Sequence, residues 1–180
     1  MVPSGGIRDT KEIAVTVIGI DPGLSGGISI LHKGELPIMH RMPTSDGIDE
    51  CAVRGILEDA LITARNRAMT MPPILAYIEK VNAMPKQGVT SMFNFGAGWG
   101  LVRGIMCGLG IPYTLIRPQE WQKVLLAGLN RDDTKAAAYA YVSRLYPTLD
   151  YRISERGHKP HDGKVDSLCI AIYGRDHGKR

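Results

Sequence analysis

Apolar residues along the chain fall into five short runs bounded by residues typical of turns. The runs are rich in Val, Ile and Leu, and glycine or proline interrupts the pattern between them. Runs of about 4 to 8 apolar residues with this punctuation predict buried strands. The five predicted strands are residues 13–20, 26–32, 36–41, 74–81 and 111–116. Because little more than Lys33-Gly34 separates the second run from the third, these two are predicted to form a hairpin.

Between and after these strands, apolar positions recur at helical spacing. Ser45-Asp46-Gly47 is predicted to start a helix, because apolar positions three and four residues apart follow it over residues 53–64. Four more helices are predicted: a glycine-containing segment at 91–108, a short helix opened by Pro118, a helix capped by 132–134, and a buried helix that includes 167–173. This order of elements predicts an α/β or mixed-sheet layer fold.

Length and composition fit one globular domain. The chain has 180 residues, 44% of them hydrophobic, and no run approaches the roughly 18 apolar residues that cross a bilayer. No membrane role is therefore expected.

The net charge of +4 mildly favours a polyanionic partner. We divide the chain into a flexible N-terminal arm at 1–12, a domain at 13–176 and a short basic tail at 177–180.

The N-terminal segment and the cysteines favour a reducing compartment. Residues 1–10 lack the apolar core of a signal peptide. The three cysteines, Cys51, Cys107 and Cys169, are widely spaced and odd in number, which favours neither a disulfide framework nor a zinc site. We expect them to be small core residues of a cytoplasmic protein.

Four carboxylates stand where the pattern predicts burial. Asp21 and Glu79 lie at the ends of the two most apolar predicted strands, and Asp162 and Asp166 lie beside the buried C-terminal helix. Burying a carboxylate costs several kcal/mol unless a cation or hydrogen bonds replace its water. Their joint occurrence on three core elements therefore suggests one shared cation site.

The type and spacing of these residues point to a divalent ion. Asp162 and Asp166 are four residues apart, so they share one face if the helix begins at or before Asp162. Carboxylate oxygens suit Mg²⁺ or Mn²⁺, and two such ions can hydrolyse a phosphodiester. Taken singly, each residue has an ordinary alternative: a turn residue for Asp21, an ion-paired strand end for Glu79, and helix caps for the other two.

Three segments resemble, in order and spacing, the acidic motifs of RuvC-type Holliday-junction resolvases, over roughly residues 15–174. The segments are Gly19-Ile20-Asp21-Pro22-Gly23 with Ser25-Gly26-Gly27, then Tyr77-Ile78-Glu79-Lys80-Val81, then residues 161–168, His-Asp-Gly-Lys-Val-Asp-Ser-Leu. The phage members and the plant chloroplast resolvase are the most similar branch, which favours a bacterial or phage-infected cytoplasm. The bacterial enzyme usually spaces its last two acidic positions by three, so His158 and His161 remain alternatives to Asp162 as the fourth ligand.

The resemblance implies an RNase H-like nuclease domain: a central mixed five-stranded sheet with helices on both faces. It also implies two Mg²⁺ ions per site, with Mn²⁺ as the alternative. Asp21 would bridge both ions, Glu79 would bind one, and Asp162 and Asp166 would complete the other. Lys164 and His161 are candidates for a catalytic or phosphate contact, with a solvated lysine and a surface histidine as the alternatives.

Relatives act as homodimers on four-way or other branched DNA, and the resemblance extends this expectation to the present chain. The glycine-containing helix would be the dimer surface, unless it only packs into the core. Phe93 and Phe95 would stack on a base, unless they too belong to the core. The further candidates for DNA contacts, each with a solvated surface as the alternative, are Lys86, Gln87, Lys123, Arg131, Lys135, Arg152, Arg156, Lys159 and Lys164.

The expected function is a structure-selective endodeoxyribonuclease that resolves Holliday junctions by paired symmetric nicking. Two alternatives stay open: a ribonuclease that cuts RNA/DNA hybrids with the same carboxylates, and a junction-binding protein without catalysis. An actin-like kinase, which also has an Asp-x-Gly phosphate hairpin, needs a second lobe for which 180 residues leave no room.

Overall fold

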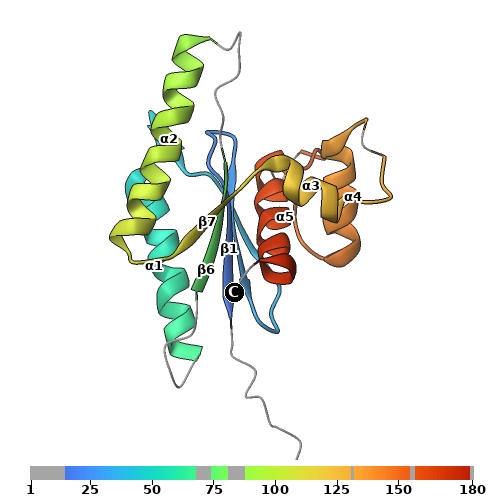
Figure 1. Ribbon diagram of the computed structural model, residues 1–180, viewed down its shortest axis with the longest axis horizontal. Helices are drawn as coiled ribbons and strands as arrows, with labels where there is room; N and C mark the ends of the chain where they lie inside the picture. Colours follow the sequence, from blue (N-terminus) through green and yellow to red (C-terminus); the bar gives the residue numbers. More distant parts are fainter. Residues whose placement is uncertain (1–14, 68–73, 81–87, 131, 155–156, 179–180) are drawn as a thin grey trace, which may run out of the picture.

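The computed structural model describes residues 15–67, 74–80, 88–130, 132–154 and 157–178. Its centre is a five-stranded sheet in the order β3-β2-β1-β6-β7 (Figure 1). The strands are β1 (Thr16–Asp21), β2 (Gly27–His32), β3 (Ile38–Arg41), β6 (Ile74–Glu79) and β7 (Tyr113–Ile116). β1 pairs antiparallel with β2 and parallel with β6, so the sheet is mixed, and the five strands predicted from the apolar runs are confirmed.

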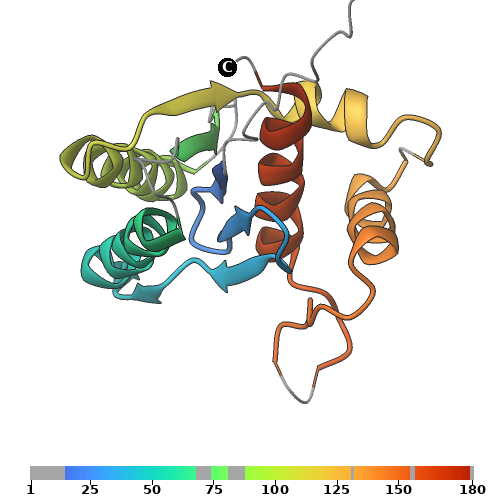
Figure 2. The ribbon, with the colours of Figure 1, turned by 90° about the horizontal axis from the view of Figure 1, so that it is seen from below.

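Helices cover both faces of the sheet, as predicted. Two of them, α1 (Glu50–Arg67) and α2 (Val89–Gly108), lie on one face. The C-terminal helix α5 (Asp162–His177) lies on the other, and α3 (Pro118–Leu125) and α4 (Thr134–Leu145) pack outside it (Figures 1 and 2). The alternation of β1 side chains divides the core accordingly: Val17 packs with the α5 side, and Ile18 and Ile20 pack with α1 and α2.

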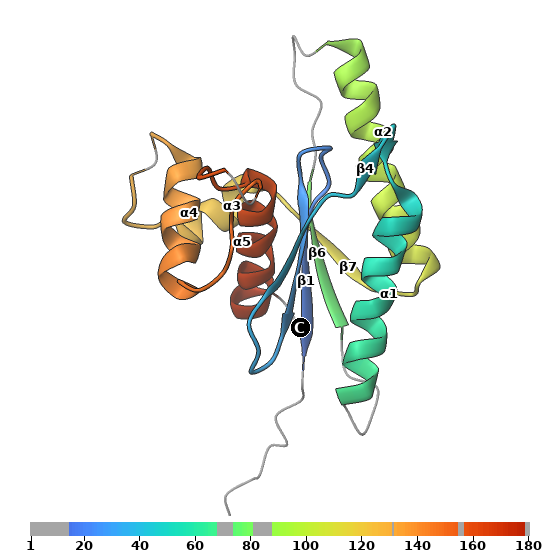
Figure 3. The ribbon, with the colours of Figure 1, turned by 180° about the vertical axis from the view of Figure 1, so that it is seen from behind.

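The start of α1 differs from the prediction that Ser45-Asp46-Gly47 begins a helix. Those residues belong to a small antiparallel pair, β4 (Thr44–Ser45) with β5 (Gly47–Ile48), which Figure 3 shows beside α1. Gly47 turns the chain there with a φ of 118°, a conformation that favours glycine. Asp49 then caps the helix, because its Oδ1 accepts a hydrogen bond of 2.9 Å from the Ala52 amide.

Cys169 is buried, but Cys51 and Cys107 are exposed, so the prediction that all three cysteines lie in the core was wrong for two of them.

The described part of the chain contains no helix that is both long and apolar enough to cross a membrane.

The helix α5 lies unusually close to the sheet, because glycines line the contact. A Cβ added to Gly19 in β1 would overlap the carbonyl oxygen of Ser167 in α5. A Cβ added to Gly163 would overlap the backbone of Ser25 and Gly26. Backbone therefore packs directly on backbone, and this contact sets where the acidic residues of α5 lie relative to the end of β1.

Replacing Gly163 with alanine tests this contact. We expect Gly163→Ala to lower the free energy of unfolding by about 1 to 3 kcal/mol, because the added methyl group must push α5 off the sheet. Urea unfolding measures the change. The matched control is Gly55→Ala in α1, where a Cβ meets nothing within 4 Å, and there alanine should stabilise the helix by about 0.5 to 1 kcal/mol. Equal stability of the two variants would contradict the close contact.

Candidate metal centre

Asp21 stands at the last position of β1, where the strand ends in a tight turn. The Gly26 amide donates to the Gly23 carbonyl at 2.8 Å, and this closes the turn. The Gly23 amide lies 3.4 Å from Asp21 Oδ1, so the turn also holds the carboxylate. Burial raises the pKa of Asp21 above its ordinary value, although the contact with Gly23 opposes the change. Asp21 therefore lies in a position that disfavours its own charge.

Glu79 reaches the same edge of the sheet from β6. Because β1 and β6 are parallel and Ile20 is paired with Ile78, both strands end side by side. Burial raises the pKa of Glu79 to about 7, and repulsion by Asp21 adds to this, while a hydrogen bond from Trp121 opposes it. Trp121 Nε1 donates to Glu79 Oε1 at 3.0 Å and so fixes the side chain.

Sequence reasoning missed the role of Trp121. This residue is buried on the first turn of α3, which begins at Pro118 directly after β7. The available signal was Pro118, because proline favours the first position of a helix and so indicated that a helix begins directly after the strand. The pairing of β7 with β6, which brings this turn to Glu79, could not be deduced from the apolar runs alone.

Asp162 and Asp166 both belong to α5, which begins at Asp162, so the condition under which their spacing puts them on one face is met. The helix begins at Asp162, and the N-cap is His161, whose Nδ1 accepts from the Lys164 amide at 3.3 Å. Asp166 is half-buried, and burial followed by repulsion from Asp21, Glu79 and Asp162 raises its pKa to about 7. Asp162 is exposed and forms an ion pair with Lys135 from α4. Two carboxylates of α5 thus face the two strand ends.

The four carboxylates form one electrostatically coupled cluster, as the repulsions between them indicate. No three His, Cys, Asp or Glu side chains within the described ranges lie close enough, as they stand, to hold one ion. The ammonium of Lys135 instead supplies positive charge: it pairs with Asp162 and lowers the pKa of Asp21 and Asp166. Four carboxylates that repel one another and already attract a cation fit a hard divalent ion in their chemistry.

The two histidines considered as alternative ligands have other surroundings. The ring of His161 accepts the capping hydrogen bond described above. His158 is exposed and lines a cavity of about 350 Å³ with Tyr139, Leu149 and Asp150. The structure therefore provides a local partner for His161, and the choice of fourth ligand remains a prediction.

The candidate DNA-contacting residues that the structure describes differ in how exposed they are. Phe95 is half-buried, and its ring lies 3.5 Å from the place of a Cβ on Gly23, two residues after Asp21. Phe93 is 73% exposed, so it is not a core residue. Lys123, Arg152 and Lys159 are exposed. Four of the predicted residues lie outside the described ranges: Lys86, Gln87, Arg131 and Arg156.

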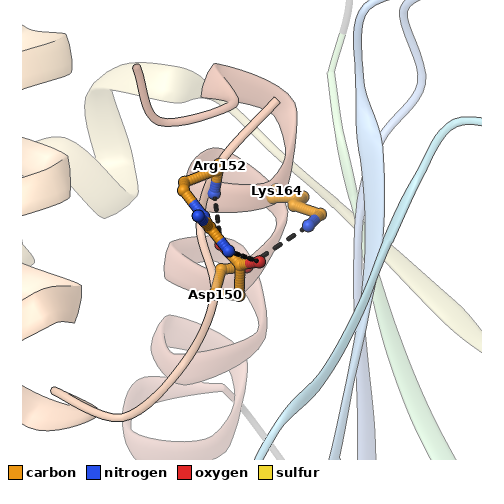
Figure 4. Close-up of polar contacts among 3 residues, drawn as sticks. All are labelled: Asp150, Arg152 and Lys164. Carbon is orange, nitrogen blue, oxygen red and sulfur yellow. Dashed lines mark hydrogen bonds and ion pairs between the residues drawn. The ribbon is translucent and has the colours of Figure 1, made fainter. Parts of the chain in front are cut away.

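Lys164 belongs to a small polar network with the preceding loop. Its ammonium donates to the Asp150 carbonyl oxygen at 3.2 Å (Figure 4). The Asp150 carboxylate is held by Arg152, with Nε to Oδ1 at 2.8 Å and a second guanidinium nitrogen to Oδ2 at 3.0 Å. These hydrogen bonds hold the pKa of Asp150 below its usual range. Lys164 is therefore bound to a backbone carbonyl beside a carboxylate that Arg152 already neutralises.

Comparisons with known proteins identify the fold. No protein-family model matches the sequence, and no curated protein matches it. Among solved structures, Thermus thermophilus RuvC in complex with a Holliday junction substrate is similar, with 16% identity, a TM-score of 0.51, and coverage of 91% of this chain and 97% of that chain. A second *T. thermophilus* RuvC structure matches with 16% identity, a TM-score of 0.50, and coverage of 89% and 95%.

A third solved structure is more distant. The yeast mitochondrial Holliday junction resolvase has 13% identity and a TM-score of 0.45, with coverage of 86% of this chain and 75% of that one. The two RuvC structures, together with the mixed five-stranded sheet and its helices, show that this chain has the RuvC-type, RNase H-like α/β fold.

Proposed function

We propose that the protein is a divalent-metal-dependent endonuclease that resolves four-way DNA junctions by paired symmetric nicking. The observation that carries this proposal is the convergence of four carboxylates from β1, β6 and α5 at one edge of a RuvC-type fold. Three of them have a raised pKa from burial and mutual repulsion. Such a cluster is costly for a folded protein unless cations bind there.

Two Mg²⁺ ions, or Mn²⁺ in their place, are the proposed cofactors. Asp21, Glu79, Asp162 and Asp166 would hold them. When bound, such ions supply an activated water and stabilise the leaving oxygen of a phosphodiester. The chain's own contribution is positioning: Trp121 orients Glu79 through its indole hydrogen bond, and the close packing of α5 on β1 sets the place of Asp166.

Lys135 has a defined part in this proposal. Its ammonium pairs with Asp162 in this structure. If Asp162 also held an ion, its attraction for the Lys135 ammonium would weaken, because one carboxylate charge would be shared between two cations. Lys135 would then be free to contact a DNA phosphate, which accords with its prediction as a DNA-contacting residue.

Resolution of a junction by symmetric nicks requires two active sites, and we propose that α2 supplies the dimer surface. Small residues recur three and four positions apart on its exposed side, so they share one face of the helix. They are Ala97, Gly100, Gly104 and Gly108. A Cβ at any of the three glycines meets nothing within 4 Å, so this face is open to a second copy.

Placing a bulky, charged side chain on this face of α2 tests whether the face forms the dimer interface. We expect Gly104→Arg to convert a dimer into a monomer in sedimentation velocity, because a long cation prevents two helices from approaching closely. The position is open in the isolated chain, so folding should be unaffected. The matched control is Ile62→Arg, which places the same side chain at an exposed apolar position of α1. A monomeric wild type, or a variant that remains dimeric, would refute α2 as the interface.

Cleavage of a labelled four-way junction tests the proposed activity. In Mg²⁺, we expect wild-type protein to make paired symmetric nicks, and Asp21→Asn to reduce the rate at least about 100-fold, because the neutral amide weakens binding of the ions. Matched linear duplex and RNA/DNA hybrid serve as alternative substrates. Cleavage confined to the hybrid would favour a ribonuclease. Binding of the junction in Ca²⁺ without cleavage of any substrate in Mg²⁺ would favour a non-catalytic junction-binding protein.

The raised pKa values predict how stability depends on pH and metal. Glu79 and Asp166 hold protons in the folded state up to a pKa of about 7, whereas unfolded carboxyl groups lose them near pH 4. The folded state therefore binds more protons between these values, and its stability falls as pH rises through that window. In EDTA, we expect the free energy of unfolding to fall by about 2 kcal/mol from pH 5 to pH 8.

The doubly substituted variant Glu79→Gln, Asp166→Asn is the control for this effect. It should be more stable than wild type at pH 8 in EDTA and show little of the pH dependence, because neither amide ionises. Mg²⁺ should raise the Tm of wild type at pH 8 and leave that of the variant almost unchanged. An equal pH dependence in the two proteins would show that these carboxylates do not titrate as described.

A further inference from the structure

A cationic cleft lies at the end of β3, next to the carboxylate cluster. Its volume is about 550 Å³, and β3, the segment after it and the start of α5 line it. Four basic side chains contribute to the lining: His40, Arg41, His161 and Lys164. Asp49 is the acidic residue in the lining. Its carboxylate caps α1 through the Ala52 amide, so its charge is already engaged at a helix N-terminus.

The strand register places this cleft at a defined distance from Asp21. Asp21 is paired with Gly27 across β1 and β2, and Gly27 is paired with Arg41 across β2 and β3. Residues directly opposite one another in an antiparallel pair point to the same face, so Arg41 and Asp21 share the α5 face. Two strand spacings separate their backbones by about 10 Å. At a rise of about 3.4 Å per nucleotide, this is about three nucleotides of one strand.

The guanidinium of Arg41 and the ammonium of Lys164 are each hydrogen-bonded to a backbone carbonyl oxygen and not to a carboxylate. Arg41 donates to the Ile153 carbonyl at 3.4 Å, and Lys164 donates to the Asp150 carbonyl at 3.2 Å. Among the described residues, neither takes part in an ion pair within 4.0 Å. Arg152 holds the carboxylate of Asp150, the nearby acid that would otherwise compete for Lys164 (Figure 4). Both cations keep N–H donors for a ligand.

The loop that precedes α5 therefore holds both cations at one open cleft through carbonyl oxygens. The Asp150 carboxylate of this loop, which also attracts Lys164, is hydrogen-bonded to Arg152. Lys164 also acts on His40 from across the cleft: burial lowers the pKa of His40, and the positive charge of Lys164 lowers it further. Asp59 has the opposite, smaller effect. Arg41 and Lys164 thus bring two positive charges from separate elements to one cleft, an arrangement that favours an anion between them.

We propose that this cleft binds a backbone phosphate of the DNA strand that crosses the carboxylate cluster, about three nucleotides from the phosphate to be cut. Arg41 and Lys164 donate to the phosphate oxygens, and His40 lies at the wall of the same cleft. The inference rests on the proposed nuclease function. It adds Arg41 and His40 to the predicted contacts, and it assigns Lys164 to phosphate binding. The shared ligand chemistry is a phosphate group, which free inorganic phosphate also provides.

Salt-dependent binding of the four-way junction in Ca²⁺ tests the role of Arg41. We expect Arg41→Gln to weaken binding about 5- to 20-fold at 100 mM salt and to reduce the slope of log K against log salt by about 1, because one phosphate contact is lost. The matched control is Arg65→Gln, which removes the same charge from an exposed position near the end of α1. Equal loss in both variants would overturn the cleft as a specific site.

A second measurement does not depend on junction cleavage. In EDTA, a short oligothymidylate should shift the imidazole NMR signals of His40 in wild type and in Arg65→Gln, but not in Arg41→Gln. Inorganic phosphate at the same phosphate concentration should have a much smaller effect. A shift with inorganic phosphate alone would identify a site for small anions and overturn the DNA assignment.

The two experiments separate the inference from the proposed function. If wild type fails to cut the junction while the oligothymidylate shifts His40 as described, the nuclease proposal fails and the phosphate cleft stands. If wild type cuts the junction while Arg41→Gln binds like Arg65→Gln and His40 does not shift, the nuclease proposal stands and the cleft is overturned.

Discussion

The direct contact between the backbone of α5 and the backbone of β1 and β2 is the constraint on which the candidate site depends. It exists because Gly19, Gly27 and Gly163 have no side chains at the interface, where a Cβ would overlap the opposite backbone. The buried hydroxyls of Ser29 and Ser167 then form a hydrogen bond of 2.8 Å between the same elements. Moving α5 outward by even one methyl group would also move the carboxylates that it contributes.

The same packing makes the charged form of these carboxylates unfavourable in the folded protein. Asp21, Glu79 and Asp166 lie close enough to repel one another, and each is withdrawn from solvent, so their pKa values rise. The two apolar cores on either side of the sheet must offset this cost in the folded protein. Bound cations would remove much of it, so the stability of the fold and its capacity for divalent ions are coupled through these side chains.

Much of this arrangement could be predicted from the sequence, and the parts that could not have a common physical reason. Apolar runs locate the five strands, and α5 begins at Asp162, the condition under which the spacing of Asp162 and Asp166 puts both on one face. Local patterns of this kind do not specify which strands pair. For that reason, the hydrogen bond from Trp121 to Glu79 and the ion pair of Lys135 with Asp162 were not foreseen. Each joins elements far apart in the sequence through tertiary packing.

The start of α1 was misjudged for a different reason. Ser45 and Asp46 are both good capping residues, and so is Asp49, which performs that role. The sequence offers several candidates within five residues, and the extended β4–β5 pair takes the earlier ones. Propensity alone could not choose between them, because the choice depends on where α1 must lie against the sheet.

Strand direction explains why negative and positive groups meet at one edge. β1 and β6 are parallel and end together, which brings Asp21 and Glu79 side by side. β2 runs away from that edge and β3 returns to it, so the hairpin delivers Arg41 level with Asp21. α5 begins at the same edge between the two groups, with Asp162 and Asp166 directed to one and Lys164 to the other. A polyanionic strand with divalent cations would match both groups at once, because the ions would neutralise the carboxylates while the cationic cleft would bind the phosphates that follow.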